Sequence, residues 1–94
     1  MSRVRAMSTL YRPLACDLHD YLEIACLYGY RLRIELDDGS WMHARALDTR
    51  TLPSKEEVLV VRAGGEERQL RLDRLHAITA LTPGARFGRV VLRR

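Results

Sequence analysis

Three carboxylates at short spacing are the residues of this 94-residue chain best placed to do chemistry. Asp17, Asp20 and Glu23 follow one another at intervals of three, so a helix would present successive members as neighbours on its surface. Paired carboxylates can serve general acid–base catalysis, or they can attract a basic partner. The sequence shows no pocket beside them that would support catalysis. The three carboxylates therefore indicate attraction of a basic partner and not catalysis.

A short helix over residues 16–26 is the element that must position these carboxylates. Asp17 stands where an N-cap belongs, and Asp20 follows three residues later, as in a weak capping box. Gly29 would end the helix as a C′ glycine. Acidic residues in a first turn often only complement the helix dipole, so this structural interpretation stands beside the functional one. The apolar positions that recur at helical spacing and should face the core are Leu18, Leu22, Ala25 and Cys26.

Alternating hydrophobicity after Gly29 predicts a series of short antiparallel strands. The first is residues 30–37, and Asp38-Gly39 is a strong hairpin signal after it. Further strands are expected at residues 41–48, 56–63, 66–72 and 75–81, with a loop at 49–55 and either an edge strand or a tail at 88–92.

One helix followed by five hairpin-linked strands predicts a mainly β fold with one N-terminal helix. A small antiparallel barrel of the Sm-like or SH3-like kind is expected, because closure avoids bare sheet edges. The OB-fold is the competing architecture, although its helix usually falls between strands. We expect a flexible N-terminal lead at residues 1–10, one domain at 11–81, and a basic tail or edge strand at 82–94.

The positive net charge of +4 is distributed unevenly along the chain. Seven of the sixteen basic residues precede Pro13 or follow Gly84, which leaves nine basic against twelve acidic residues between Pro13 and Ala85. The body therefore carries a net charge of −3. Basic proteins often bind nucleic acid, but the basic ends and the few aromatic residues argue against direct nucleic-acid binding here.

Several function classes lack their signatures in this sequence. Cys16 and Cys26 would lie about 15 Å apart on a helix, too far for a disulfide, so both are expected to be reduced. The cysteines and three histidines do not form a zinc pattern, and no catalytic motif is present, so we expect neither an enzyme nor a cofactor. No signal peptide or membrane-length apolar run is evident, which predicts a cytoplasmic protein.

The chain opens with the pattern Tyr11-x-Pro13-x-x-Cys16-Asp17-x-x-Asp20-x-Leu22-Glu23-x-Ala25-Cys26. This pattern resembles the opening signature of the Rho-binding antiterminator family (Rof, or YaeO-like proteins). The resemblance continues through residues 36–39, 59–61 and 68–73, and it covers about residues 11–81.

The resemblance implies an Sm-like barrel that binds the transcription termination factor Rho at its RNA-binding N-terminal domain. Such a protein competes with RNA and inhibits Rho-dependent termination, without catalysis, a cofactor, a small-molecule substrate or a membrane. Carried over by motif, the resemblance implies that Asp17, Asp20 and Glu23 meet Rho's basic RNA site. It also implies contacts from His19 on the same helix and from Lys55 in a flanking loop.

An Sm-like RNA-binding module is the alternative function. It is motivated by the predicted barrel, by the arginine-rich ends and by Arg31 and Arg33, which alternation places on the polar face of the first strand.

Overall fold

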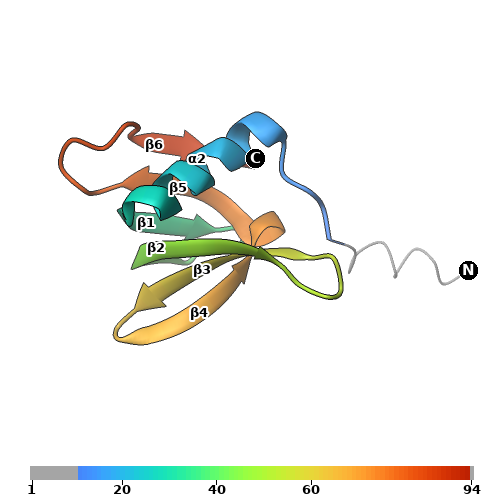
Figure 1. Cartoon of the computed structure of the whole chain (residues 1–94). Helices are drawn as coiled ribbons and strands as arrows, with labels where there is room; N and C mark the ends of the chain where they lie inside the picture. Colours follow the sequence, from blue (N-terminus) through green and yellow to red (C-terminus); the bar gives the residue numbers. More distant parts are fainter. Residues whose placement is uncertain (1–10, 94) are drawn as a thin grey trace, which may run out of the picture.

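The computed structural model describes residues 11–93, which form an α-helix and a six-stranded antiparallel sheet (Figure 1). The predicted lead at residues 1–10 lies outside this described part. The helix is α2 (Cys16–Tyr28), and one turn of 3-10 helix, η1 (Leu72–Arg74), connects two strands. The strands are β1 (Arg31–Leu36), β2 (Trp41–Thr51), β3 (Glu57–Ala63), β4 (Glu66–Arg71), β5 (Leu75–Ala80) and β6 (Arg89–Val91).

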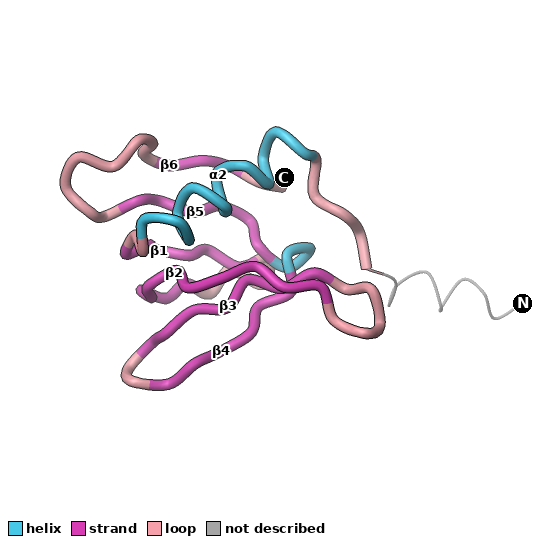
Figure 2. Tube along the Cα trace, viewed as in Figure 1, coloured by secondary structure: helices cyan, strands magenta, loops and turns pink. Residues whose placement is uncertain are grey.

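The strands are ordered β4-β3-β2-β1-β5-β6 across the sheet, which curves beneath α2 (Figure 2). The predicted mainly β fold with one N-terminal helix is confirmed. The strand order is compatible with an Sm-like barrel, although within residues 11–93 the edge strands β4 and β6 are not paired with each other. In the same described part, no helix has the length and apolarity needed to cross a membrane.

The N-cap of helix α2 lies two residues before the predicted cap, Asp17. Ala15, in extended geometry, is the N-cap residue and offers no side-chain cap, so the prediction that Asp17 caps the helix was wrong. Asp17 lies inside the first turn, where its carboxylate accepts a hydrogen bond from the Leu18 N–H at 3.0 Å. The predicted end is confirmed: Gly29 adopts a left-handed conformation (φ 63°) and its N–H is directed at carbonyls of the last turn.

The core lies between α2 and the concave side of the sheet. Leu22 and Ala25 of α2 are fully buried and belong to one cluster with Leu32, Ile34 and Ala46. Burying a leucine side chain stabilises a fold by about 1.5–3 kcal/mol, so these contacts fix the helix on the sheet. Strand β3 is buried from Val58 to Val61, as its continuous apolar run predicted.

One strand extends beyond its predicted bounds, and of the two alternatives for residues 88–92 the structure has the edge strand. Strand β2 continues to Thr51 because Thr49, Arg50 and Thr51 pair with the start of β3, after a register shift that follows Ala46. The predicted loop at 49–55 is therefore shorter and runs from 52 to 56. At the other edge, β6 pairs with β5, with Arg89 opposite Thr79.

Candidate protein-binding surface

Two of the predicted site residues, Asp17 and Asp20, are exposed on the first half of α2. Within residues 11–93, neither carboxylate lies at ion-pair distance from a basic group. Both therefore present an uncompensated negative charge at the surface of the described chain.

His19 connects the helix to the sheet through two carboxylates. Its Nδ1 lies 3.1 Å from Glu23 Oε2, one helical turn away, and its Nε2 lies 3.5 Å from Glu57 Oε1 at the start of β3. Both contacts are ion pairs only when the imidazole ring carries a proton on each nitrogen. His19 is largely covered, with 20% of its side chain exposed, whereas Glu23 remains 60% exposed.

Glu57 was missed by sequence reasoning. It comes 34 residues after Glu23 in the chain, and no local pattern indicates that the start of β3 lies beside the helix. Its Oε1 also accepts a long hydrogen bond from the Tyr11 hydroxyl at 3.4 Å. We define Asp17, Asp20, Glu23 and Glu57 as the acidic surface.

Lys55 lies two residues before Glu57, in the loop that joins β2 and β3. It is exposed, and it is the non-glycine residue with positive φ (77°) in the described chain. Its N–H donates to the Leu52 carbonyl at 2.8 Å, which closes a tight turn. Lys55 is therefore close in the chain to Glu57 of the acidic surface, in a loop and not on the helix.

Shallow hollows lie on both sides of the His19 bridge. One is lined on its sheet side by Thr49, Arg50 and Thr51 of β2. The other is lined on its helix side by Pro13, Leu14, Cys16 and Asp20. Glu23 and Glu57 of the acidic surface line both hollows together with His19, so this part of the surface separates two open depressions that side chains of a partner protein can enter.

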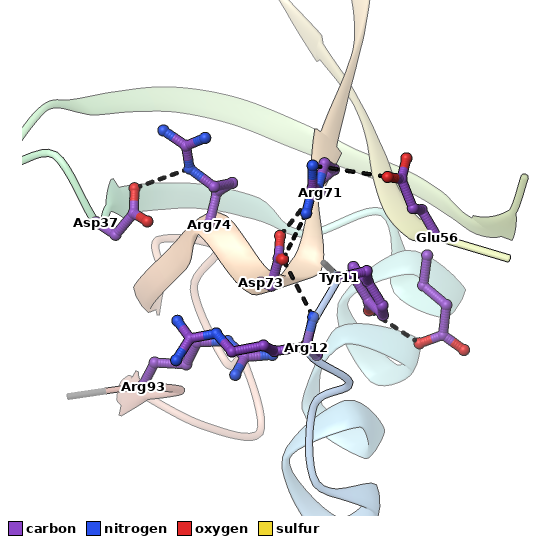
Figure 3. A network of polar contacts seen from close by, with 9 residues as sticks. Tyr11, Arg12, Asp37, Glu56, Arg71, Asp73, Arg74 and Arg93 are labelled. Carbon is purple, nitrogen blue, oxygen red and sulfur yellow. Dashed lines mark hydrogen bonds and ion pairs between the residues drawn. The ribbon is translucent and has the colours of Figure 1, made fainter. Parts of the chain in front are cut away.

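A buried carboxylate fixes the segment that leads into α2 (Figure 3). Asp73, only 5% exposed, accepts two hydrogen bonds from Arg71, at 3.1 Å and 2.7 Å, and one from the Arg12 N–H at 3.2 Å. The Arg71 guanidinium also lies 5.9 Å from the centre of the Tyr11 ring and 3.6 Å from Glu56. These contacts hold residues 11 and 12 against the sheet.

The surroundings of this network shift the pKa values of Asp73 and Tyr11 in opposite directions. Burial alone would raise the pKa of Asp73, but the Arg71 hydrogen bonds, the Arg12 N–H and the neighbouring positive charges outweigh burial and hold that pKa below its usual range. Burial and the nearby Glu57 carboxylate raise the pKa of Tyr11 to about 12. Asp73 is therefore ionised and Tyr11 neutral at neutral pH.

Cys16 and Cys26 are both free, as predicted; Cys16 is exposed and Cys26 is partly buried. Among residues 11–93, no group of three or more histidine, cysteine or acidic side chains is arranged to hold a metal ion.

Comparison with known proteins identifies relatives that share both sequence and fold. The family described as "Modulator of Rho-dependent transcription termination (ROF)" matches residues 13–92. Protein rof of Escherichia coli (strain K12) and that of Shigella flexneri are each 45% identical over 71 residues, which cover 73% of this chain and 81% of the relative.

A solved structure described as YaeO bound to magnesium, from Vibrio cholerae O395, is similar in fold. Its TM-score is 0.73 at 27% sequence identity, and the match covers 79% of this chain and 96% of that one. On these grounds, the chain belongs to the ROF family of modulators of Rho-dependent transcription termination.

Proposed function

We propose that this chain binds Rho at the RNA-binding face of its N-terminal domain and thereby competes with RNA. Asp17, Asp20 and Glu23 make the principal contacts, His19 holds Glu23 in place, and Lys55 contacts Rho from the flanking loop. The observation that carries the proposal is the pair of exposed carboxylates, Asp17 and Asp20, which no basic group neutralises within residues 11–93.

The physical basis is charge complementarity. A protein surface that attracts phosphates also attracts a fixed array of carboxylates. The helix supplies that array, since residues three apart rise by about 4.5 Å along its axis. An arginine–carboxylate contact that loses water at an interface is stronger than a solvated ion pair. The first half of α2 thus offers negative charge at regular intervals on a rigid support.

The supporting contacts explain why this charge array is rigid. The His19 bridge restrains the Glu23 carboxylate from one side, and buried Leu22 fixes the same turn from beneath. A preorganised side chain loses less conformational entropy on binding. Binding of this kind needs no chemical step and no cofactor. We therefore propose a non-enzymatic regulator that acts in the cytoplasm through the domain at residues 11–81.

Charge reversal on the helix tests the proposal. In the double variant Asp20→Lys/Glu23→Lys, two attractive contacts become repulsive. Because a hydrogen bond to a charged group contributes about 1.5–3 kcal/mol, affinity for Rho should fall by at least about 100-fold. Isothermal titration of purified Rho measures the affinity, and circular dichroism checks that the variant is folded.

The matched control is Glu66→Lys/Glu67→Lys, which changes the net charge equally. These residues are 76% and 54% exposed and begin β4, at the turn from β3, away from the first half of α2 (Figure 1). The control should bind Rho with nearly native affinity. Equal affinities of the two double variants would show that α2 does not form the contact.

A further inference from the structure

The outer face of β1 and β2 carries a second charged surface that the proposed function does not use. The strand register places Arg31 opposite Arg45 and Arg33 opposite His43, with Trp41 next along the same face. All five side chains are exposed. We define Arg31, Arg33, Trp41, His43 and Arg45 as the arginine–tryptophan face.

Trp41 is 54% exposed, although a tryptophan in a chain of this size would be expected to pack in the core. The Arg33 guanidinium lies 4.4 Å from the centre of its ring, and the His43 ring lies 5.2 Å away. Cation–π contact therefore orders the indole without covering it. An ordered, exposed aromatic ring is a surface on which another flat group can stack.

The positive charge on this face is largely uncompensated. Within residues 11–93, no carboxylate lies at ion-pair distance from Arg31, Arg33 or Arg45. The carboxylate on the same face is Glu35, and it accepts two hydrogen bonds of 2.9 Å from Arg89. Three guanidinium groups thus remain available for an anion.

A hollow continues this face toward the C-terminal end of α2. It is lined by Tyr28, Arg31, His43, Arg45, Leu81 and Thr82. Tyr28 is 49% exposed, and the Arg86 guanidinium lies 5.0 Å from the centre of its ring. Arginine and aromatic groups therefore alternate from Trp41 to Tyr28, along a path that an extended chain could follow.

We propose that the arginine–tryptophan face binds single-stranded RNA, with phosphates on Arg31, Arg33 and Arg45 and a base stacked on Trp41. Basic grooves with exposed aromatic rings are the usual means of holding single strands, because every base has a flat face. An acidic protein segment would use the arginines but would gain little from the indole. The combination on this face therefore favours RNA.

This surface is distinct from the acidic surface. Asp17 and Gly29 are twelve residues apart, about 18 Å along the axis of α2, and the arginine–tryptophan face adjoins the Gly29 end. One chain could therefore contact Rho at one end of the helix and a transcript at the other.

A titration of the full chain with a twelve-nucleotide oligouridine, without Rho, tests the proposal. Trp41 is the single tryptophan, so quenching of its fluorescence reports stacking directly. Three phosphate contacts predict a salt slope of about −2, which weakens binding by about 20-fold between 50 and 200 mM salt. Trp41→Ala should weaken binding, followed by anisotropy of labelled RNA, by about 5- to 150-fold.

The variants Trp41→Phe, Arg33→Gln and Arg68→Gln separate the possible causes. Trp41→Phe should keep most of the affinity, and Arg33→Gln should flatten the salt slope by about 0.7. Arg68 lies on the edge strand β4, opposite Val61 and outside the arginine–tryptophan face, and its side chain is 55% exposed, so Arg68→Gln should bind normally.

Four results would overturn the proposal. They are no binding at 50 mM salt, native affinity in Trp41→Ala and Arg33→Gln, a loss confined to Arg68→Gln, and displacement by oligoglutamate at the same concentration as by unlabelled RNA. The last result would assign the face to an acidic protein instead.

Discussion

Replacing Asp73 by asparagine should destabilise the fold more than any surface charge change. Asp73→Asn keeps the size of the side chain but removes the charge that Arg71 pairs with. It also replaces one carboxylate oxygen by an NH₂ group, so at least one of the three donors from Arg71 and Arg12 loses its acceptor. Figure 3 shows this carboxylate among Arg71, Arg12 and Arg93.

The magnitude follows from the burial of the two partners. Breaking a fully buried ion pair costs about 3–5 kcal/mol, because the remaining charge is left without compensation. Here the Asp73 side chain is 6% exposed but that of Arg71 is 31% exposed, so water can solvate part of the guanidinium. We therefore expect a loss of about 2–3 kcal/mol in the free energy of unfolding. For a domain of this size, that loss lowers Tm by about 8–24 °C.

Thermal unfolding followed by circular dichroism measures the effect. The matched control is Asp37→Asn, which breaks the neighbouring ion pair with Arg74 at 3.1 Å. The Asp37 side chain is 42% exposed and that of Arg74 is 57% exposed, so the control should lose less than about 1 kcal/mol in the free energy of unfolding. Equal Tm values for the two variants would refute the view that Asp73 anchors the segment before α2.

The pH dependence of the free energy of unfolding gives a second test of the pair between Arg71 and Asp73. The pKa of Asp73 is lower in the folded than in the unfolded state. Its stabilisation is therefore complete above the unfolded pKa of about 4 and is lost as the pH falls through the lower folded value. The difference in unfolding free energy between the native chain and Asp73→Asn should stay constant from pH 7 to about 4.5 and shrink below it. A difference that grows on acidification would contradict the assignment.

Three further predictions concern other parts of the fold. Gly29→Ala forces a left-handed alanine and should lower the free energy of unfolding in urea by about 1 kcal/mol; no change would contradict the helix end described. Tyr11 should ionise near pH 12 in an ultraviolet titration, so its contribution to stability fades between pH 10 and 12, and Tyr11→Phe should remove that step. At pH 8, Cys16 should react rapidly with a thiol reagent and Cys26 slowly, because burial and nearby carboxylates raise the pKa of Cys26 to about 11; equal rates would contradict this.

The parts of the fold that depend on local sequence could be predicted. The end of α2 at Gly29, the turn at Asp38-Gly39 and the buried run of β3 each have a nearby physical cause. The start of α2 was misplaced because Asp17 satisfies the sequence rule for a cap, whereas the chain turns into the helix at Ala15. The hydrogen bond from the Arg12 N–H to Asp73 holds the segment before that entry, and this long-range contact is not visible in the local pattern.

The features that depend on long-range pairing could not be predicted. Glu57 joins the acidic surface only because β3 starts beside α2. Asp73 is buried because it pairs with Arg12, 61 residues earlier in the chain, and no local pattern indicates this. Trp41 is exposed because its side of β2 is uncovered, which alternation alone cannot show. The roles of His19 and Lys55 toward Rho remain predictions that rest on the family resemblance.

A competition titration tests the central claim most directly. Labelled RNA is bound to Rho, the chain is added, and the amount of RNA still bound is measured. Running the titration also with Trp41→Ala separates displacement from Rho from capture of RNA by the chain itself. The native chain and Trp41→Ala should both displace RNA completely, and Asp20→Lys/Glu23→Lys should displace none. With Trp41→Ala, which is weakened in its own RNA contact, a complex in which Rho holds the chain and the RNA together at saturation would contradict the claim that carboxylates of α2 occupy the RNA site.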